Sequence, residues 1–102
     1  MTIPRRDLDF QVFEVLDAEG LCRLPRYAEH DRQVFDGVID SACRIARERF
    51  APYASACDVN EPRVVDGRVW MIPETKQAFD AYNEAAFTAA SFDIEDGGMQ
   101  LP

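Results

Sequence analysis

Hydrophobic residues recur every three or four positions along three stretches of the chain, a spacing typical of helices with one buried face. We expect these helices over about Asp7–Asp17, Asp31–Arg49 and Glu74–Ala90. The second stretch has the most regular pattern, and its apolar stripe consists of Val34, Phe35, Val38, Ile39, Ala42, Ile45 and Ala46. The sequence therefore predicts a mainly α fold with three principal helices.

Residues with known preferences for helix ends set the expected limits of these helices. The Asp7 side chain is suited to cap the N-terminus of the first helix, and Gly20 is suited to end this helix. Pro52 disfavours the α conformation at Ala51, so the second helix should end there. Pro73 suits the first turn of the third helix.

The segments between these helices lack a helical period. Leu21–Ala28 contains Pro25 and is expected to be a connector, and residues 54–62 are expected to be irregular.

Within the second helix, Asp40 and Arg44 stand four residues apart in the order that favours an ion pair. A glycine in the same helix, Gly37, costs about 1 kcal/mol relative to alanine, which either a close helix crossing or simple tolerance would explain.

Two short runs rich in β-prone residues flank Asp66-Gly67, and this dipeptide favours a tight hairpin turn. We therefore expect one short β-hairpin over Arg63–Met71. A lone two-stranded hairpin is marginally stable in water. Trp70 and Met71 should consequently pack against a further surface, either the helices of this chain or another part of a larger protein.

The third helical stretch carries mainly small residues on its apolar face, which lets another element approach closely. The stripe consists of Ala78, Phe79, Tyr82, Ala85, Ala86, Ala89 and Ala90. Phe87 and Phe92 are expected in a core or docking surface, and contact with an acyl chain is a less favoured alternative. Because a globule of this size is marginal even when compact, we expect the isolated chain to be weakly stable or to self-associate.

The chain has 102 residues, so it holds one domain at most, and it carries 19 acidic and 11 basic residues for a net charge of −8. Such a charge opposes binding to nucleic acids and to anionic membranes. The negative net charge also disfavours a binding site for a polyphosphate such as coenzyme A. No stretch approaches the roughly 18 apolar residues that a membrane span needs.

Cysteine and histidine usage argues against a disulfide framework and a metal site. Cys22, Cys43 and Cys57 include no Cys-x-x-Cys pair, and the chain does not open with an apolar signal core. These features predict a cytoplasmic location. His30 is the single histidine, and one histidine without a cysteine pair at ligand spacing does not predict a metal centre or a catalytic base.

The segment near the end of the chain contains two further groups of residues that could take part in ligand or cation binding. Gly97-Gly98 lacks the preceding strand and the lysine that phosphate-binding loops use. Asp93, Glu95 and Asp96 could join a cation site or could keep a loop solvated, and the second reading is favoured because hard cations need more oxygen ligands in defined spacing. We therefore assign no catalytic, cofactor-binding or metal residues in this chain.

Three sequence landmarks occur in a characteristic order, at Arg6–Phe10, Asp66–Val69 and Asp96–Pro102. Together they resemble the N-terminal helical region of bacterial acyl-CoA dehydrogenases, in the subfamily with an extra N-terminal segment. The resemblance covers nearly the whole chain. It implies that residues 1–30 are the N-terminal extension segment and that residues 31–102 are part of the family's N-terminal helical domain.

Members of this family oxidise acyl-CoA thioesters between the α and β carbons. A glutamate removes the α proton, and the β hydride passes to the flavin of FAD. The flavin is held by a central β domain and a C-terminal helical domain, which also carries the glutamate. The resemblance therefore implies an incomplete N-terminal helical domain that acts as a scaffold, with FAD and acyl-CoA bound only by the full-length parent.

The same resemblance bears on the end of the chain. A double glycine followed by Leu101-Pro102 predicts a tight loop and then the start of a further helix. Many relatives carry glycine where this chain has Gln100, so we expect that position to use positive φ less freely. The expected partner of the scaffold is the remainder of the parent chain or another copy of itself.

A second hypothesis belongs to a different class of protein. The chain could be a self-contained acidic helical module that binds a protein partner or associates with itself. Extending the reading frame beyond Pro102 would separate the two hypotheses, because a flavoenzyme continues for several hundred residues.

Overall fold

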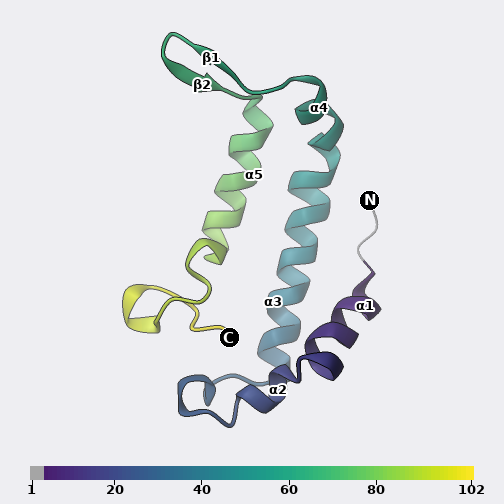
Figure 1. The fold of residues 1–102 in the computed structure, drawn as a ribbon, viewed down its shortest axis with the longest axis vertical. Helices are drawn as coiled ribbons and strands as arrows, with labels where there is room; N and C mark the ends of the chain where they lie inside the picture. Colours follow the sequence, from purple (N-terminus) through teal and green to yellow (C-terminus); the bar gives the residue numbers. More distant parts are fainter. Residues whose placement is uncertain (1–3) are drawn as a thin grey trace.

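The body of the molecule is a pair of antiparallel helices, α3 (Arg32–Ile45) and α5 (Pro73–Glu84), in a computed structural model that describes residues 4–102. A helical N-terminal segment lies against α3, and a hairpin projects from the other end of the pair (Figure 1). The molecule measures 51 × 33 × 17 Å, so it is a thin slab. The mainly α fold with one hairpin confirms the prediction.

The N-terminal segment begins with α1 (Arg5–Asp9), which continues directly into a π-helical turn over Phe10–Val15. The prediction of a helix here is confirmed, but its start is wrong. Pro4 occupies the N-cap position, and Asp7 lies inside the first turn, where an acidic side chain interacts favourably with the helix dipole.

The first helical segment ends at Val15, with Leu16 as its C-cap, which is within two residues of the predicted Asp17 and before Gly20. Asp17 adopts the left-handed conformation with φ 48°, which aspartate tolerates better than most residues. It then caps a short helix, α2 (Ala18–Leu21), by accepting a hydrogen bond from the Gly20 N–H. Gly20 is therefore inside α2, and we refer to Arg5–Leu21 as the N-terminal strap. A 3₁₀ turn over residues 25–27 occupies part of the predicted connector.

Helix α3 confirms the strongest sequence prediction. Asp31 caps it by accepting a hydrogen bond from the Val34 N–H at 2.9 Å. Nothing lies within 4 Å of a side chain that would be added at Gly37, so tolerance and not a close crossing explains this glycine. After Ile45 the helix widens into a π-helical turn over Ala46–Phe50.

Pro52 does not end the helical path, contrary to prediction. Ala51 keeps α-region angles, φ −57° and ψ −41°, and a 3₁₀ turn over Ala51–Tyr53 leads into α4 (Ala54–Val59). The segment predicted to be irregular is thus largely helical. Pro52 lies in the first turn of the 3₁₀ element, where its missing N–H costs no hydrogen bond, so the chain changes helix type and continues.

The predicted hairpin is present as β1 (Arg63–Val65) and β2 (Arg68–Trp70), paired antiparallel with Val64 opposite Val69. Asp66 and Gly67 both have positive φ, as the favoured two-residue turn requires. The Arg63 guanidinium lies 4.4 Å from the centre of the Trp70 ring. Val64 remains 73% exposed, so the hairpin has no partner for one of its apolar positions.

Helix α5 starts at Pro73 as predicted but ends at Glu84, six residues before the expected Ala90. The chain turns because Ala86 adopts the left-handed conformation, with φ 64°. This turn brings the Phe87 ring to 5.4 Å from the Tyr82 ring. Contact between these rings replaces the helical continuation that the alanine pattern indicated.

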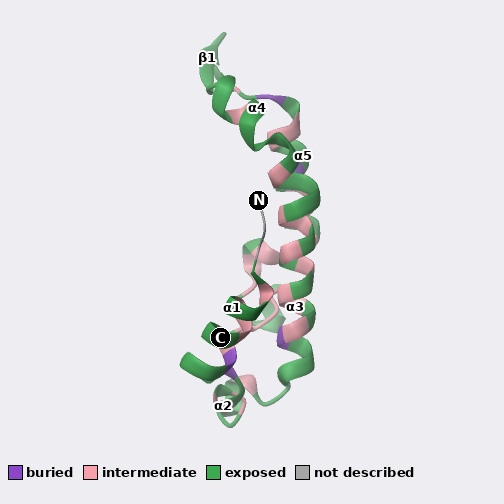
Figure 2. Cartoon of the chain, turned by 90° about the vertical axis from the view of Figure 1, so that its right-hand side faces the viewer, coloured by how far each residue is buried: buried purple, intermediate pink, exposed green. Residues whose placement is uncertain are grey.

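Buried side chains are few among the described residues. The main cluster joins Phe13, Ala18 and Phe35, and Ile72 and Ala78 are buried separately. Most of the chain is intermediate or exposed (Figure 2). The accessible surface is 7621 Å², against about 5,800 Å² for a compact monomer of 11.6 kDa. The radius of gyration, 16.8 Å, likewise exceeds the roughly 13 Å of a compact domain of this length.

No helix in residues 4–102 combines the length and the apolar character that crossing a membrane requires.

Candidate functional site

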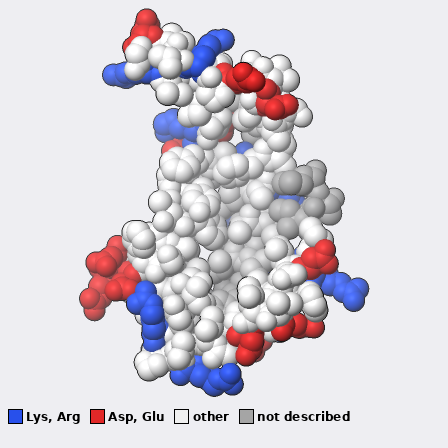
Figure 3. All heavy atoms as spheres, in the orientation of Figure 1, with Lys and Arg blue, Asp and Glu red and all other residues white. Residues whose placement is uncertain are grey.

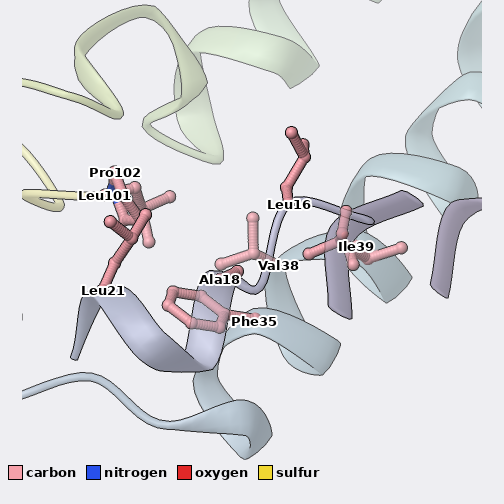
Figure 4. Close-up of a pocket in the computed structure, with 9 residues that line it drawn as sticks. Leu16, Ala18, Leu21, Phe35, Val38, Ile39, Leu101 and Pro102 are labelled. Carbon is pink, nitrogen blue, oxygen red and sulfur yellow. The ribbon is translucent and has the colours of Figure 1, made fainter. Parts of the chain in front are cut away.

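An apolar groove of about 380 Å³ lies between the N-terminal strap and α3 (Figure 4). Phe35 is 6% exposed at its floor, whereas Leu16 is 69% exposed at its rim. The groove is lined by Val12, Leu16, Ala18 and Leu21 from the strap, by Phe35, Val38 and Ile39 from α3, and by Leu101 and Pro102. These side chains offer no base or nucleophile, so the groove is suited to packing against apolar groups.

Arg5 joins the strap to α3 beside this groove. Its Nε donates to Asp9 Oδ1 at 2.7 Å, its Nη2 donates to Asp36 Oδ1 at 2.7 Å, and its Nη1 pairs with Asp40. The hydrogen bond to Asp9 is the main cause that raises the pKa of Arg5, while partial burial acts in the opposite direction. Asp40 thus pairs with Arg5, and its predicted ion pair with Arg44 does not form.

A second arginine bridges the strap and α3. Arg32 Nη1 donates to Glu19 Oε1 at 3.1 Å, and its Nε lies 3.8 Å from Asp36 Oδ2. The same guanidinium lies 4.0 Å from the centre of the Phe13 ring, close enough for a cation–π contact. Arg32 therefore covers part of the core cluster and also extends the network around Asp36.

The loop over residues 93–102 is fastened to the connector that follows the strap. His30 Nε2 donates to the Gln100 carbonyl oxygen at 2.8 Å. The Gln100 side chain donates to the Arg26 carbonyl at 2.7 Å and accepts from the Ile94 N–H at 3.3 Å. Arg26 also pairs with Asp93 at 2.6 Å. These bonds hold Leu101 beside the core cluster, where it forms one end of the groove.

Backbone geometry in this loop contradicts the expectation for Gln100, which adopts positive φ, 51°. Its two side-chain hydrogen bonds compensate for a conformation that glycine would adopt without strain. Gly97 also has positive φ, 83°. Gly98 is required for another reason, because an added Cβ would collide with the backbone oxygen of Phe92.

The residues that the sequence singled out for chemistry are distributed over separate surfaces. Of the acidic cluster, Asp93 is paired with Arg26, and no group of three potential metal ligands occurs among the described residues. His30 makes a structural hydrogen bond and lies 6.0 Å from the Phe35 ring. Phe92 is exposed, so the structure places it outside the buried cluster.

Sequence reasoning missed both the Arg5 network and the Gln100 contacts. The spacing of Arg5 and Asp9, and of Asp36 and Asp40, gave a partial signal, because each pair stands on one face of a helix. The pattern does not reveal which helix faces which. The hydrogen bonds of Gln100 connect residues about 70 positions apart, and no local pattern could have indicated them.

Comparison with known proteins yields one distant relative. No family model and no solved structure matches the chain. A 3-methylmercaptopropionyl-CoA dehydrogenase of Ruegeria pomeroyi is 26% identical to the chain over 99 residues. The match covers 97% of this chain but 17% of the relative's length. The chain is thus distantly similar to one part of a much longer acyl-CoA dehydrogenase.

Proposed function

We propose that the chain is the N-terminal helical part of an FAD-dependent acyl-CoA dehydrogenase, in which it is a structural scaffold without catalytic machinery. The observation that carries this proposal is the match with the Ruegeria dehydrogenase, which spans nearly the whole chain but about a sixth of the relative. The sequence landmarks at both ends of the chain support the same family. In the full-length parent, other domains perform the α,β-dehydrogenation of acyl-CoA thioesters.

The exposed surface of the chain supports a role as one layer of a larger protein. The excess over a compact monomer is about 1,800 Å², whereas one side of a standard protein interface buries about 800 Å². Charged side chains lie around the edges of one broad face and leave its middle uncharged (Figure 3). Such a face suits close packing against further domains of the same polypeptide.

The coding sequence beyond the Pro102 codon tests this proposal. We expect an open reading frame of several hundred codons that encodes the remaining dehydrogenase domains. A stop codon directly after Pro102 would contradict the proposal. As a biochemical complement, the isolated chain should retain no flavin through gel filtration and should not reduce a dye with an acyl-CoA substrate.

A second candidate is a self-contained acidic module that associates with itself or with another protein. Its supporting observation is the same exposed apolar surface, including Phe10, Phe79 and Tyr82, because a second copy could cover it. The net charge of −8 opposes association between identical copies at low ionic strength, so added salt should strengthen any such association.

A further inference from the structure

The N-terminal strap contacts α3 through polar bridges as well as through apolar burial. Phe13 and Ala18 are its buried apolar residues, and both contact Phe35. In contrast, Phe10, Val15 and Leu16 are each about half exposed or more. The buried apolar contact with α3 is therefore limited to this cluster and the partly buried Val12 beside it, and the ionic contacts add to the attachment.

Charge balance at the contact depends on Arg5. The strap contributes Asp9 and α3 contributes Asp36 and Asp40, and all three carboxylates meet the single Arg5 guanidinium. Without that guanidinium, Asp9 would face Asp36 and Asp40 across the contact, and among the described ion pairs Asp36 alone would keep a partner, Arg32 at 3.8 Å. The attraction between the strap and α3 would then weaken, and Asp9 would repel Asp40.

The environment of these ion pairs makes them sensitive to salt. The side chains of Arg5, Asp9 and Asp36 are 32%, 35% and 38% exposed, so solvent ions reach them. Interactions between partly exposed charges weaken as ionic strength rises. The neighbouring bridge from Arg32 to Glu19 has side chains about half exposed and responds in the same direction.

We propose that the N-terminal strap is a movable element held closed over α3 by an ionic latch centred on Arg5. Closure forms one wall of the apolar groove, so release of the latch takes the groove apart. The left-handed residue Asp17 and the connector after Leu21 are the points where the chain can bend. This device does not depend on the proposed function, because it follows from contacts within residues 5–40.

Hydrogen–deuterium exchange on the whole chain tests the latch, with peptides covering residues 5–16 compared with those covering 73–84. The test variant is Arg5→Gln. Arg6→Gln is the matched control, because Arg6 is exposed on the same helix and has no ion pair among the described residues. At low salt we expect Arg5→Gln to speed exchange in the strap about fivefold or more, while α5 and the control change little.

Salt provides a second measurement because its effect should differ between the natural chain and Arg5→Gln. In the natural chain, 1 M NaCl screens the attraction and should speed exchange in the strap. In Arg5→Gln, salt also screens the repulsion among the three carboxylates, so it should speed exchange in the strap less than it does in the natural chain. Combining Asp36→Asn and Asp40→Asn with Arg5→Gln should recover part of the protection at low salt, since the repulsion is removed but the attraction is not replaced.

A thiol measurement gives an independent readout at the end of the strap. Cys22 packs against the core cluster, whereas the Cys57 Sγ lies 3.5 Å from Thr75 Oγ1 near α5. Release of the strap should speed labelling of Cys22 relative to Cys57. The proposal is overturned if Arg5→Gln behaves like Arg6→Gln, if all helices exchange faster together, or if salt affects both proteins alike.

Discussion

At the scale of single residues, Gln100 shows how a side chain can offset an unfavourable backbone conformation. Its φ of 51° costs a non-glycine residue about 1 kcal/mol, and its amide group bridges Arg26 and Ile94 in return. The bridge connects the loop near the end of the chain to the connector that follows the strap. We therefore regard Gln100 as the residue that fixes the position of Leu101 in the groove.

Two substitutions at this position separate strain from hydrogen bonding. Gln100→Ala loses both hydrogen bonds and keeps the strain, whereas Gln100→Gly loses the bonds and relieves the strain. We expect the alanine variant to be less stable than the glycine variant by about 1 kcal/mol, measured by urea unfolding. Equal stability of the two variants would show that position 100 does not adopt positive φ.

Substitution of glycine by alanine should have opposite effects on stability at Gly98 and at Gly37. At Gly98 an added Cβ would collide with the Phe92 carbonyl, so Gly98→Ala should lower the unfolding midpoint. At Gly37 the surrounding space is open in the middle of α3, so Gly37→Ala should stabilise the chain by up to about 1 kcal/mol. Thermal unfolding followed by circular dichroism compares both variants, and a stabilising Gly98→Ala would contradict the loop geometry.

At the scale of elements, periodicity predicted where helices and the hairpin lie but not how each helix ends. The stripe of α3 and the Asp66-Gly67 turn are strong local signals, and both elements are present. Pro52 misled the prediction because the chain changed helix type instead of leaving the helical path. The end of α5 was missed because contact between Tyr82 and Phe87 decides it, and that contact forms only after the turn.

The end of α5 gives a prediction for one element. Ala86 has φ 64°, so Ala86→Gly should relieve strain and stabilise the chain by about 1 kcal/mol. Ala85 has φ −80°, so Ala85→Gly should instead destabilise it through the greater freedom of the unfolded chain. Urea unfolding of the two variants checks this pair. A destabilising Ala86→Gly would mean that the helix continues through this position in solution.

At the scale of the whole molecule, composition and size predicted a marginal core, and the structure has a large exposed surface around a few buried residues. The groove itself could not be predicted, because it exists only where the strap meets α3 and Leu101. Its lining comes from positions as far apart as Val12 and Pro102. Local patterns carry no information about such a meeting.

The exposed apolar surface leads to a prediction for the isolated chain. At tens of micromolar, sedimentation velocity should show a dimer or larger species, because apolar surface beyond a few hundred Å² usually recruits a partner. The effect should grow with salt, since screening reduces repulsion between copies of net charge −8. A strictly monomeric and sharply cooperative domain would instead favour an independent module.

One reconstitution measures most directly whether this chain completes a larger flavoenzyme, as proposed. The polypeptide encoded by the full reading frame is compared with the same polypeptide lacking residues 1–102, with and without the separately produced chain. We predict that removal of the segment lowers flavin retention and acyl-CoA-dependent dye reduction, and that the added chain restores both. Leu16→Asp at the groove rim should weaken this restoration, whereas Arg6→Gln should not. Full flavin retention and activity without residues 1–102 would contradict the account.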